Sequence, residues 1–308
     1  MQKTIEKNVI IVGTGIHLGR PARLTIKPAP TNHGIVFKRL DVDHNNTLIK
    51  ANFKYILSGE LCTTLVNEEG ISVKTVEHLL AAFSGLGISN ALIEIDNEEI
   101  PILDGSSLKF AQALIEAGIC EQDESLNFCS VKKSIKVVNK NSWVKFEPAD
   151  NLILTVCIDY PNTCIGKQSL SLLISKDTFQ KELCDNRTFC LKNDIKDMRS
   201  RGFALGGSLE NAIVVDGYSV INPKGLKRKD EFVRHKMLDA LGDLALSGLP
   251  LLGHYKAFCA GHKLNNQLLI KLFSNHSNYK VSVPDNINSE KFVDHNFCST
   301  SQNYRAVI

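Results

Sequence analysis

The pattern of apolar and polar positions in residues 231–243 predicts a helix. The segment contains no proline and one glycine, and most of its residues are good helix formers. At 3.6 residues per turn, positions four apart lie above one another, so His235, Asp239 and Asp243 share one side. The apolar side chains would supply a packing surface elsewhere on the helix: Phe232, Met237, Leu238, Leu241, Leu244 and Ala245.

The polar side of this helix has the spacing of a metal site. A neutral imidazole at His235 and a carboxylate at Asp239, one turn apart, could together bind a divalent metal ion such as zinc. A catalytic zinc ion commonly has three protein ligands and an open position for water, so a third ligand would have to come from elsewhere. The alternative is a solvated helix face with an ordinary contact between residues four apart. The helix alone does not decide between these interpretations.

A second helix is predicted over residues 74–86, where apolar residues recur at three- and four-residue spacing. Glu77 and His78 lie near its start and flank the apolar stripe. An adjacent carboxylate and imidazole could point into one cavity, one as a proton shuttle and the other as a metal ligand. Alternatively, His78 lies at the edge of the core and Glu77 lies in solvent. For this pair alone, both interpretations stay open.

The rest of the chain shows strand patterns followed by helix, strand and helix, and this order occurs twice. An acidic, polar segment at residues 121–125 predicts a boundary between two domains, 1–124 and 125–308. We therefore predict an α+β fold of two similar layered domains, with a site at their interface. Strands are expected at 8–37, 61–66, 91–96, 130–138, 143–147, 152–159, 212–215 and 253–261, and helices at 106–117, 175–184 and 264–274.

Composition indicates an ordinary globular protein. The 308 residues are 43% hydrophobic and 22% charged, and no apolar run reaches the roughly 18–20 residues that cross a bilayer. The polar N-terminus lacks the apolar region of a secretory signal. The nine cysteines are scattered and form no CxxC pair, which argues against a disulfide framework and a cysteine-type zinc site. A reducing cytoplasm is the expected compartment.

Charge is distributed unevenly between the two halves. Residues 1–126 carry 11 Lys/Arg against 16 Asp/Glu, a balance of −5, and residues 127–308 carry 25 against 17, a balance of +8. No basic motif with interleaved aromatic residues is present, which argues against nucleic acid as a partner. A small anionic substrate, such as a phosphorylated one, fits the basic half better. The glycines of residues 13–19 have the wrong spacing for a dinucleotide loop.

Several short segments are weak signals singly but specific in combination and order. The main three are residues 75–79, 232–243 and 261–266. Together they resemble the UDP-3-O-acyl-N-acetylglucosamine deacetylases, which are zinc amidases at the committed step of lipid A synthesis. The resemblance runs from about residue 5 to about residue 275, and five further segments support it: 13–19, 61–63, 100–106, 187–189 and 200–208.

The resemblance implies a metal site built from both halves of the chain. His78, His235 and Asp239 would be the zinc ligands, so the missing third ligand comes from the first half. An iron(II) ion would suit the same ligand set. Glu77 would be the general base that deprotonates the attacking water.

Further catalytic roles follow from the same resemblance. His262 would be cationic, would stabilise the developing oxyanion and would help to protonate the leaving amine. Asp243 would hold that imidazole in place. Thr188 would donate a hydroxyl hydrogen bond to the tetrahedral intermediate. Lys236 would project to a different side, towards the polar part of the substrate.

The resemblance also implies two α+β domains packed through their helices, with a βαβ insert at about residues 190–220 in the second domain. This insert would form an apolar passage for the acyl chain of the substrate. Cys62 and Phe189 would lie near the mouth of the passage, with Phe203 and Ile213 along it. Residues 160–168 depart from the family pattern, so the contacts expected of that loop are in question.

The expected substrate is a UDP-sugar lipid precursor, and the chain is expected to act as a monomer without a transmembrane segment. Two alternatives remain: a zinc amidase acting on another N-acetyl sugar, and a non-catalytic binding module with a structural metal. A structural zinc site is normally closed by a fourth Cys or His ligand, and the sequence offers no obvious candidate.

Overall fold

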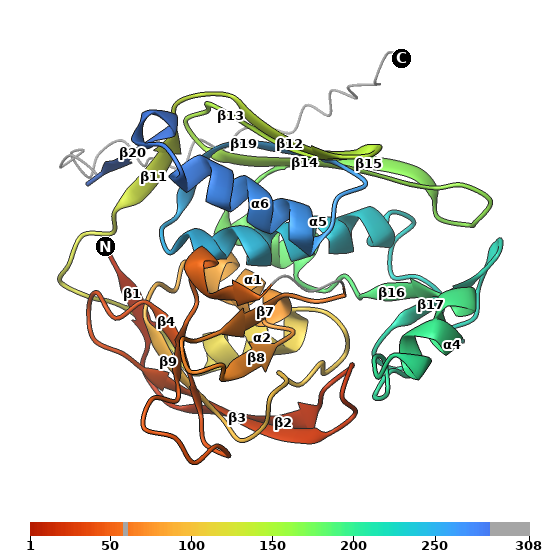
Figure 1. Cartoon of the computed structure of the whole chain (residues 1–308), viewed down its shortest axis with the longest axis horizontal. Coiled ribbons are helices and arrows are strands. Elements are labelled where there is room, and N and C mark those ends of the chain that lie inside the picture. The colour runs from red at the N-terminus through yellow and green to blue at the C-terminus, as the bar shows by residue number, and fades with distance from the viewer. Residues whose placement is uncertain (58–60, 284–308) are drawn as a thin grey trace.

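The computed structural model describes residues 1–57 and 61–283. The predicted α+β fold class is confirmed: two sheets lie on the outside, and the helices between them face each other (Figure 1). The hydrophobic core runs through both sheet-and-helix layers and through the helices between them. Among the described residues, no helix is both long and apolar enough to cross a membrane.

Helices α1 (Glu77–Leu86) and α5 (Glu231–Leu244) pack against each other at the centre of the molecule (Figure 1). Gly242 allows their backbones to approach closely, because a Cβ atom at this position would lie 2.0 Å from the carbonyl oxygen of Glu77. Any larger residue would push the helices apart. This contact brings the first turn of α1 beside the second half of α5, although the two segments are far apart in the sequence.

The first sheet has the strand order β2-β3-β9-β4-β5 and is antiparallel except for the β4–β9 pair. Burial alternates along β3, so one face of the sheet packs into the core and the other meets solvent. Helix α2 (Leu108–Glu116) contacts α1, and Gly118 follows it with a φ of 81°. The strands are β2 (Val9–Thr14), β3 (Pro21–Pro28), β4 (Ile35–Arg39), β5 (Leu48–Lys50) and β9 (Ala91–Ile95).

Short elements complete the first half of the chain. A small antiparallel sheet ends at Lys74 and leads directly into α1 through Thr75 and Val76. The first strand of the chain pairs with a strand that follows α2. These elements are β1 (Lys3–Ile5), η1 (Phe53–Tyr55), β6 (Ile56–Leu57), β7 (Thr64–Val66), β8 (Ser72–Lys74) and β10 (Ile119–Glu121).

The second sheet has the strand order β12-β13-β19-β14-β15, and β11 and β20 extend it at one end. Helices α5 and α6 (His262–Phe273) cover its inner face, and alternate residues of β13 and β19 are buried against them. The strands are β11 (Phe128–Val131), β12 (Ile135–Asn139), β13 (Ser142–Glu147), β14 (Leu152–Tyr160), β15 (Gly166–Leu173), β19 (Leu251–Phe258) and β20 (Tyr279–Ser282), with the short helices η3 (Ala245–Ser247) and η4 (His276–Asn278) between them.

Two segments of the second half differ from the sequence expectation. Strand β15 was not predicted from the sequence; it begins within residues 160–168, near the end of the predicted divergent loop, and its leucines alternate with exposed serines along the edge of the sheet. Residues 175–184 are helical but do not form one α-helix. Helix α3 (Lys176–Thr178) begins with a capping box of Ser175 and Thr178, and it continues as the π-helix η2 (Phe179–Leu183).

An insert of strand, helix and strand extends from the second half at the edge of the molecule (Figure 1). Strands β16 (Phe189–Leu191) and β17 (Ile213–Asp216) are parallel, with α4 (Lys192–Ser200) between them in the chain. A third strand, β18 (Ser219–Val220), pairs with β17. This arrangement is the βαβ unit that the resemblance implied for residues 190–220.

The insert is hydrogen-bonded to the loop of residues 15–19, here called the 15–19 loop. The N–H of Leu205 donates to the carbonyl oxygen of His17 at 3.0 Å, and that of Gly206 donates to Ile16 at 3.0 Å. Gly206 permits this approach, because a Cβ atom there would lie 2.2 Å from the carbonyl oxygen of Gly15. The two halves of the chain are therefore joined at a second place, beside the insert.

Candidate metal centre and active site

Two helices bring three potential metal ligands together. His78 is the second residue of α1, and His235 and Asp239 lie one turn apart on α5. Their ligand atoms lie within 4.8 Å of one another, and all three side chains are buried. Nε2 of His78 lies 3.4 Å from Oδ1 of Asp239, and Nε2 of His235 lies 3.2 Å from the same oxygen. The two imidazole rings are perpendicular, with centroids 5.1 Å apart.

The donor set fits a divalent metal ion. Oδ1 of Asp239 is buried without a hydrogen-bond partner among the described residues, although it faces two imidazole nitrogens. A buried carboxylate oxygen is costly to leave unpaired, and a cation at this point would satisfy it. Two imidazoles and one carboxylate are also a common ligand set of catalytic zinc sites. Within the part of the chain that the structure describes, the cluster contains these three ligands.

Neighbouring groups orient the ligands and set their charge. Nδ1 of His235 lies 3.1 Å from the carbonyl oxygen of Asn186, which directs Nε2 towards the cluster. Burial alone would raise the pKa of Asp239, but His235 and Lys236 hold that pKa well below its usual value. Asp239 is therefore an anion. Burial lowers the pKa of His235, which favours the neutral imidazole that binds metals.

A carboxylate and an imidazole face each other beside this cluster. Oε1 of Glu77 lies 3.7 Å from Nε2 of His262, and both side chains are buried. Burial raises the pKa of Glu77 to about 7, with His262 opposing the rise and Asp243 adding to it. Burial would lower the pKa of His262, but Asp243 and Glu77 raise it to about 10. At neutral pH the imidazole is thus cationic, and Glu77 can both accept and release a proton.

Asp243 accepts three hydrogen bonds that fix its position. Nδ1 of His262 lies 2.8 Å from its Oδ2, and Nδ2 of Asn265 donates to the same oxygen at 2.7 Å. The hydroxyl of Thr63 donates to Oδ1 at 2.5 Å. Oδ1 of Asn265 in turn accepts the hydroxyl of Tyr255 at 2.6 Å. The carboxylate that supports His262 is therefore itself held by residues from both halves of the chain.

Thr63 also contacts the second carboxylate of the site. Its backbone N–H donates to Oε2 of Glu77 at 3.1 Å, which leaves Oε1 facing His262. Roles for Thr63, Asn265 and Tyr255 were not predicted from the sequence. Thr63 and Asn265 lie within the resembling segments 61–63 and 261–266, so a signal existed in the sequence, but their partners could not be read from it.

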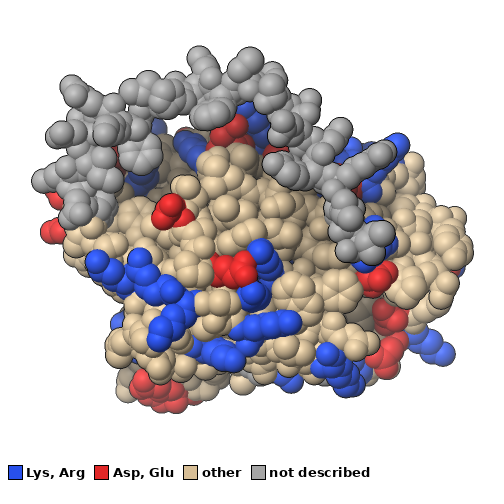
Figure 2. All heavy atoms as spheres, turned by 90° about the horizontal axis from the view of Figure 1, so that it is seen from above, with Lys and Arg blue, Asp and Glu red and all other residues tan. Residues whose placement is uncertain are grey.

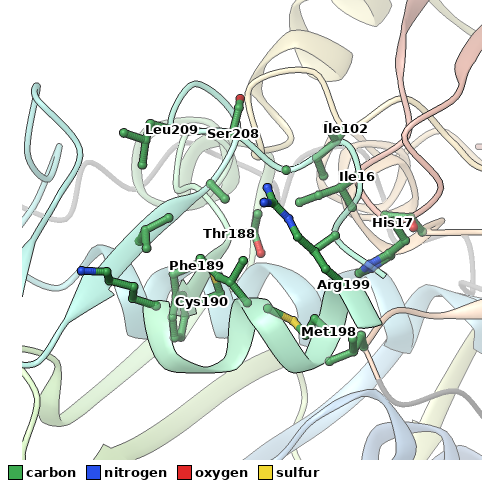
Figure 3. A pocket seen from close by; sticks show the side chains of 18 of the residues that line it. Ile16, His17, Ile102, Thr188, Phe189, Cys190, Met198, Arg199, Ser208 and Leu209 are labelled. Atoms are coloured by element: carbon green, nitrogen blue, oxygen red, sulfur yellow. The ribbon is translucent and has the colours of Figure 1, made fainter. Parts of the chain in front are cut away.

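A cavity of about 390 Å³ is lined by Glu77 and His78 at the proposed metal cluster and by residues of the insert. Its lining is mainly apolar, and it combines the 15–19 loop with α4 and the strands of the insert. Thr188 and Phe189 lie along it, and the side chain of Arg199 points into it from α4 (Figure 3). The apolar lining includes Ile16, Leu61, Ile102, Ile195, Met198, Ala204, Leu209, Ala212, Val214 and Ile221.

Of the residues predicted from the sequence to contact the acyl chain, Phe189 lines this cavity, whereas Phe203 and Ile213 do not. Ile213 is fully buried in the core, whereas its neighbours Ala212 and Val214 line the cavity, because successive residues of β17 face opposite sides. Phe203 lies behind the lining and packs edge-on against His17, with ring centroids 5.4 Å apart. His17 itself lines the cavity and was not singled out from the sequence.

Cys62 and Lys236 lie beside the site and outside the cavity lining. The thiol of Cys62 is buried 3.8 Å from the hydroxyl of Thr64, and burial together with Glu77 raises its pKa to about 12. Nζ of Lys236 turns back to Oδ2 of Asp239 at 2.9 Å and lies 5.5 Å from the centre of the Phe189 ring. The ammonium group therefore neutralises part of the charge of the cluster.

Part of the positive charge of the second half lies on the outer face of the second sheet (Figure 2). Glu147 on β13 lies between two lysines there, with Oε1 2.5 Å from Nζ of Lys145 and Oε2 2.5 Å from Nζ of Lys256. Lys145 and Glu147 alternate with buried residues of β13, and Lys256 alternates with buried residues of β19, so all three side chains point away from α6. They lie outside the lining of the cavity.

Comparison with known proteins identifies extensive similarity along the chain. Residues 2–274 match the family model described as UDP-3-O-acyl N-acetylglycosamine deacetylase. The UDP-3-O-acyl-N-acetylglucosamine deacetylase of Idiomarina loihiensis is 42% identical over 286 residues, which cover 92% of this chain and 93% of the relative. The enzyme of the same name from Campylobacter fetus is 40% identical over 291 residues, covering 94% of this chain and 98% of the relative.

Proposed function

The chain belongs to the UDP-3-O-acyl N-acetylglycosamine deacetylase family, and from this membership we propose how its residues carry out the reaction. The enzyme is a hydrolase that removes the acetyl group from the N-acetyl amide of a UDP-3-O-acyl-N-acetylglucosamine, a step of lipid A biosynthesis. The observation that carries the assignment of residues is the cluster of His78, His235 and Asp239 next to the facing pair of Glu77 and His262.

His78, His235 and Asp239 hold the metal ion of the enzyme, and we propose zinc, with iron(II) as the alternative for the same donors. The orphaned Oδ1 of Asp239 and the two nitrogens that face it support this assignment. When bound, a zinc ion would polarise the amide carbonyl group and lower the pKa of a water molecule to about 7. The chain supplies the remaining proton transfers.

Glu77 is the general base and His262 the general acid in this proposal. Glu77 takes a proton from water as the water oxygen bonds to the acetyl carbon, and its pKa of about 7 suits that transfer near neutral pH. His262, held cationic by Asp243, stabilises negative charge on the carbonyl oxygen. The carbon–nitrogen bond then breaks, and His262 gives its proton to the departing amine, leaving acetate and a free amino sugar.

The cavity beside the metal cluster receives the acyl chain of the substrate. Its apolar lining, its contact with Glu77 and His78, and its extension to the insert support this role. Each methylene group that enters such a lining contributes about 0.8 kcal/mol. Thr188, at the boundary of the cavity, would donate its hydroxyl to the reacting amide. An amidase acting on a small N-acetyl sugar would have no use for this cavity.

The test combines metal analysis with an assay for acetate release from the acylated UDP-sugar. Purified protein should contain one divalent ion per chain and should lose activity on chelation and regain it with zinc. Asp239→Ala should lose both metal and activity. Asp230→Ala is a matched control on the residue that precedes α5, because Asp230 pairs with Arg234 and lies away from the cluster. Full activity in metal-free protein would refute the proposal.

Three further features are proposed with this function. We expect a cytoplasmic enzyme, which the eight free cysteines of the described residues support. We also expect a monomer, and a division into domains 1–124 and 125–308. Size measurement in solution and limited proteolysis near residue 125 would test the last two.

A further inference from the structure

The carboxylate of Glu99 lies buried between two segments of the site, with 2% of the residue exposed. Its Oε1 accepts the backbone N–H of His17 at 2.8 Å and the hydroxyl of Thr75 at 2.9 Å. Its Oε2 accepts the N–H of Leu18 at 2.7 Å. Gly15 packs directly on this carboxylate, since a Cβ atom there would lie 2.2 Å from Oε2. Glu99 therefore joins the 15–19 loop to Thr75.

The first of these segments is a wall of the cavity. Ile16 and His17 line the cavity directly. Their carbonyl oxygens accept hydrogen bonds from the insert, so the 15–19 loop is held between Glu99 on one side and the insert on the other. An acyl chain in the cavity would press on this loop.

The second segment sets the start of α1. Thr75 has a φ of 59°, a conformation that is costly for a β-branched residue and that persists only where neighbours fix it. Glu77 and His78 follow two and three residues after Thr75. The hydrogen bond from Thr75 to Glu99 thus ties the turn that presents the general base and the first metal ligand of the proposal to the 15–19 loop, so that the turn is steadied when the loop is steadied.

We propose that Glu99 is a positioning residue that couples occupancy of the cavity to the alignment of Glu77 and His78. The inference rests on the proposed function, in that an acyl chain must occupy the cavity. Contact of the chain with Ile16 and His17 steadies the 15–19 loop, and Glu99 passes this restraint to the turn at Thr75. The acyl chain then raises kcat as well as lowering KM.

A carboxylate suits this position because its two oxygens can accept all three hydrogen bonds. Glutamine has the same shape, but it offers one oxygen and an NH₂ group. In Glu99→Gln, either the N–H of Leu18 or the donors from His17 and Thr75 would face another donor. The variant should therefore lose hydrogen bonds either to Leu18 or to His17 and Thr75, while the size of the side chain stays the same.

Glu98 offers a matched control. It is the same residue type at the adjacent position and also accepts hydrogen bonds, from the hydroxyl of Ser72 at 2.9 Å and from Nζ of Lys74 at 2.8 Å. Both partners lie on β8, and neither of these contacts reaches the 15–19 loop or Thr75. Glu98→Gln should therefore change little in catalysis.

The experiment measures kcat and KM separately for acylated and non-acylated UDP-N-acetylglucosamine, using the zinc-loaded full chain. For Glu99→Gln, kcat on the acylated substrate should fall by roughly 10²-fold, the size expected from misplacement of catalytic groups by about 1 Å. On the non-acylated substrate kcat should change little, and metal content should stay at one ion per chain. Thr75→Val, which removes one donor at constant shape, should shift kcat in the same direction by a smaller factor.

The outcomes separate the inference from the function on which it rests. If wild-type protein prefers the acylated substrate and Glu99→Gln loses the same factor on both substrates, Glu99 is merely structural and the inference fails. An unchanged kcat in Glu99→Gln also overturns it. If the wild-type protein itself does not distinguish the two substrates, then the proposed acyl cavity fails first.

Discussion

Replacing Gly242 with alanine should separate helices α1 and α5 and damage the proposed metal centre. A Cβ atom at this position would lie 2.0 Å from the carbonyl oxygen of Glu77, whereas real contacts of this kind essentially never fall below 3.0 Å. The backbones must therefore move apart by about 1 Å at this point. Metal sites tolerate errors in ligand distance of about 0.2 Å, so a shift of His78 relative to His235 and Asp239 exceeds that tolerance.

Two opposing terms set the effect on stability. Alanine is the better helix former in an exposed helix by about 1 kcal/mol, which on its own would stabilise α5. Forcing a methyl group into a packed helix contact costs about 1–3 kcal/mol. The net free energy of unfolding of metal-free protein should therefore fall by no more than about 2 kcal/mol. Metal affinity should fall by roughly tenfold or more, as it does when the groups that support metal ligands are lost.

Urea unfolding in chelator would measure the first effect, and competition with a coloured chelator would measure the second. Ala240→Gly is the matched control, because it weakens the same helix by a comparable amount without creating a close contact. The control should lose stability but keep its metal affinity. If Gly242→Ala binds metal as tightly as wild-type protein, the contact does not align the ligands and the reasoning is wrong.

Three further predictions follow from the geometry. Glu77→Gln and His262→Ala should each lower kcat by roughly 10²-fold or more, with one metal ion per chain retained; metal loss in Glu77→Gln would make Glu77 a ligand instead of the base. Burial lowers the pKa of His17 from 6.5 to about 4, so below pH 6.5 the unfolded chain binds a proton at this residue more readily than the folded chain. The free energy of unfolding should therefore be highest above pH 6.5 and should fall by at most about 3 kcal/mol as the pH is lowered to 4. Unfolding curves measured in chelator should show this pH dependence for wild-type protein and lose it for His17→Leu. Val214→Asp should lower kcat/KM for the acylated substrate by several orders of magnitude and leave turnover of the non-acylated substrate nearly unchanged, because each excluded methylene forfeits about fourfold in binding.

Local patterns in the sequence were sufficient for much of the fold. The helix predicted at 231–243 is α5 (Glu231–Leu244), and the helix predicted at 74–86 is α1 (Glu77–Leu86). These predictions succeeded because apolar residues that recur every three or four positions can be buried together only if the segment is helical. The spacing of His235 and Asp239 predicted two potential metal ligands on one helix face, and the structure brings both close to His78. Strand β15 was missed because its edge position needs little apolar surface, so its leucines alternate with serines.

Contacts between distant parts of the chain could not be derived from local patterns. Nothing in the periodicity of residues 74–86 places His78 next to α5, and that pairing came from the family resemblance alone. The hydrogen bonds from Thr63 and Asn265 to Asp243 join residues far apart in sequence. The role of Gly242 depends on which helix crosses it, and a glycine inside a helix pattern by itself indicates only a weak point.

The position of the proposed metal ligands on two different helices has a consequence for how the newly synthesised protein matures. His78 is synthesised long before His235 and Asp239, so a ribosome-bound chain that ends in the first half carries one ligand and cannot capture the ion. Pairing across such a sequence distance is slow compared with local helix formation. Metal uptake should therefore be among the last events of maturation, and the bound ion would stabilise the contact between the two halves after they have docked. In cells short of the metal, the full-length chain would lack the metal-mediated link between α1 and α5.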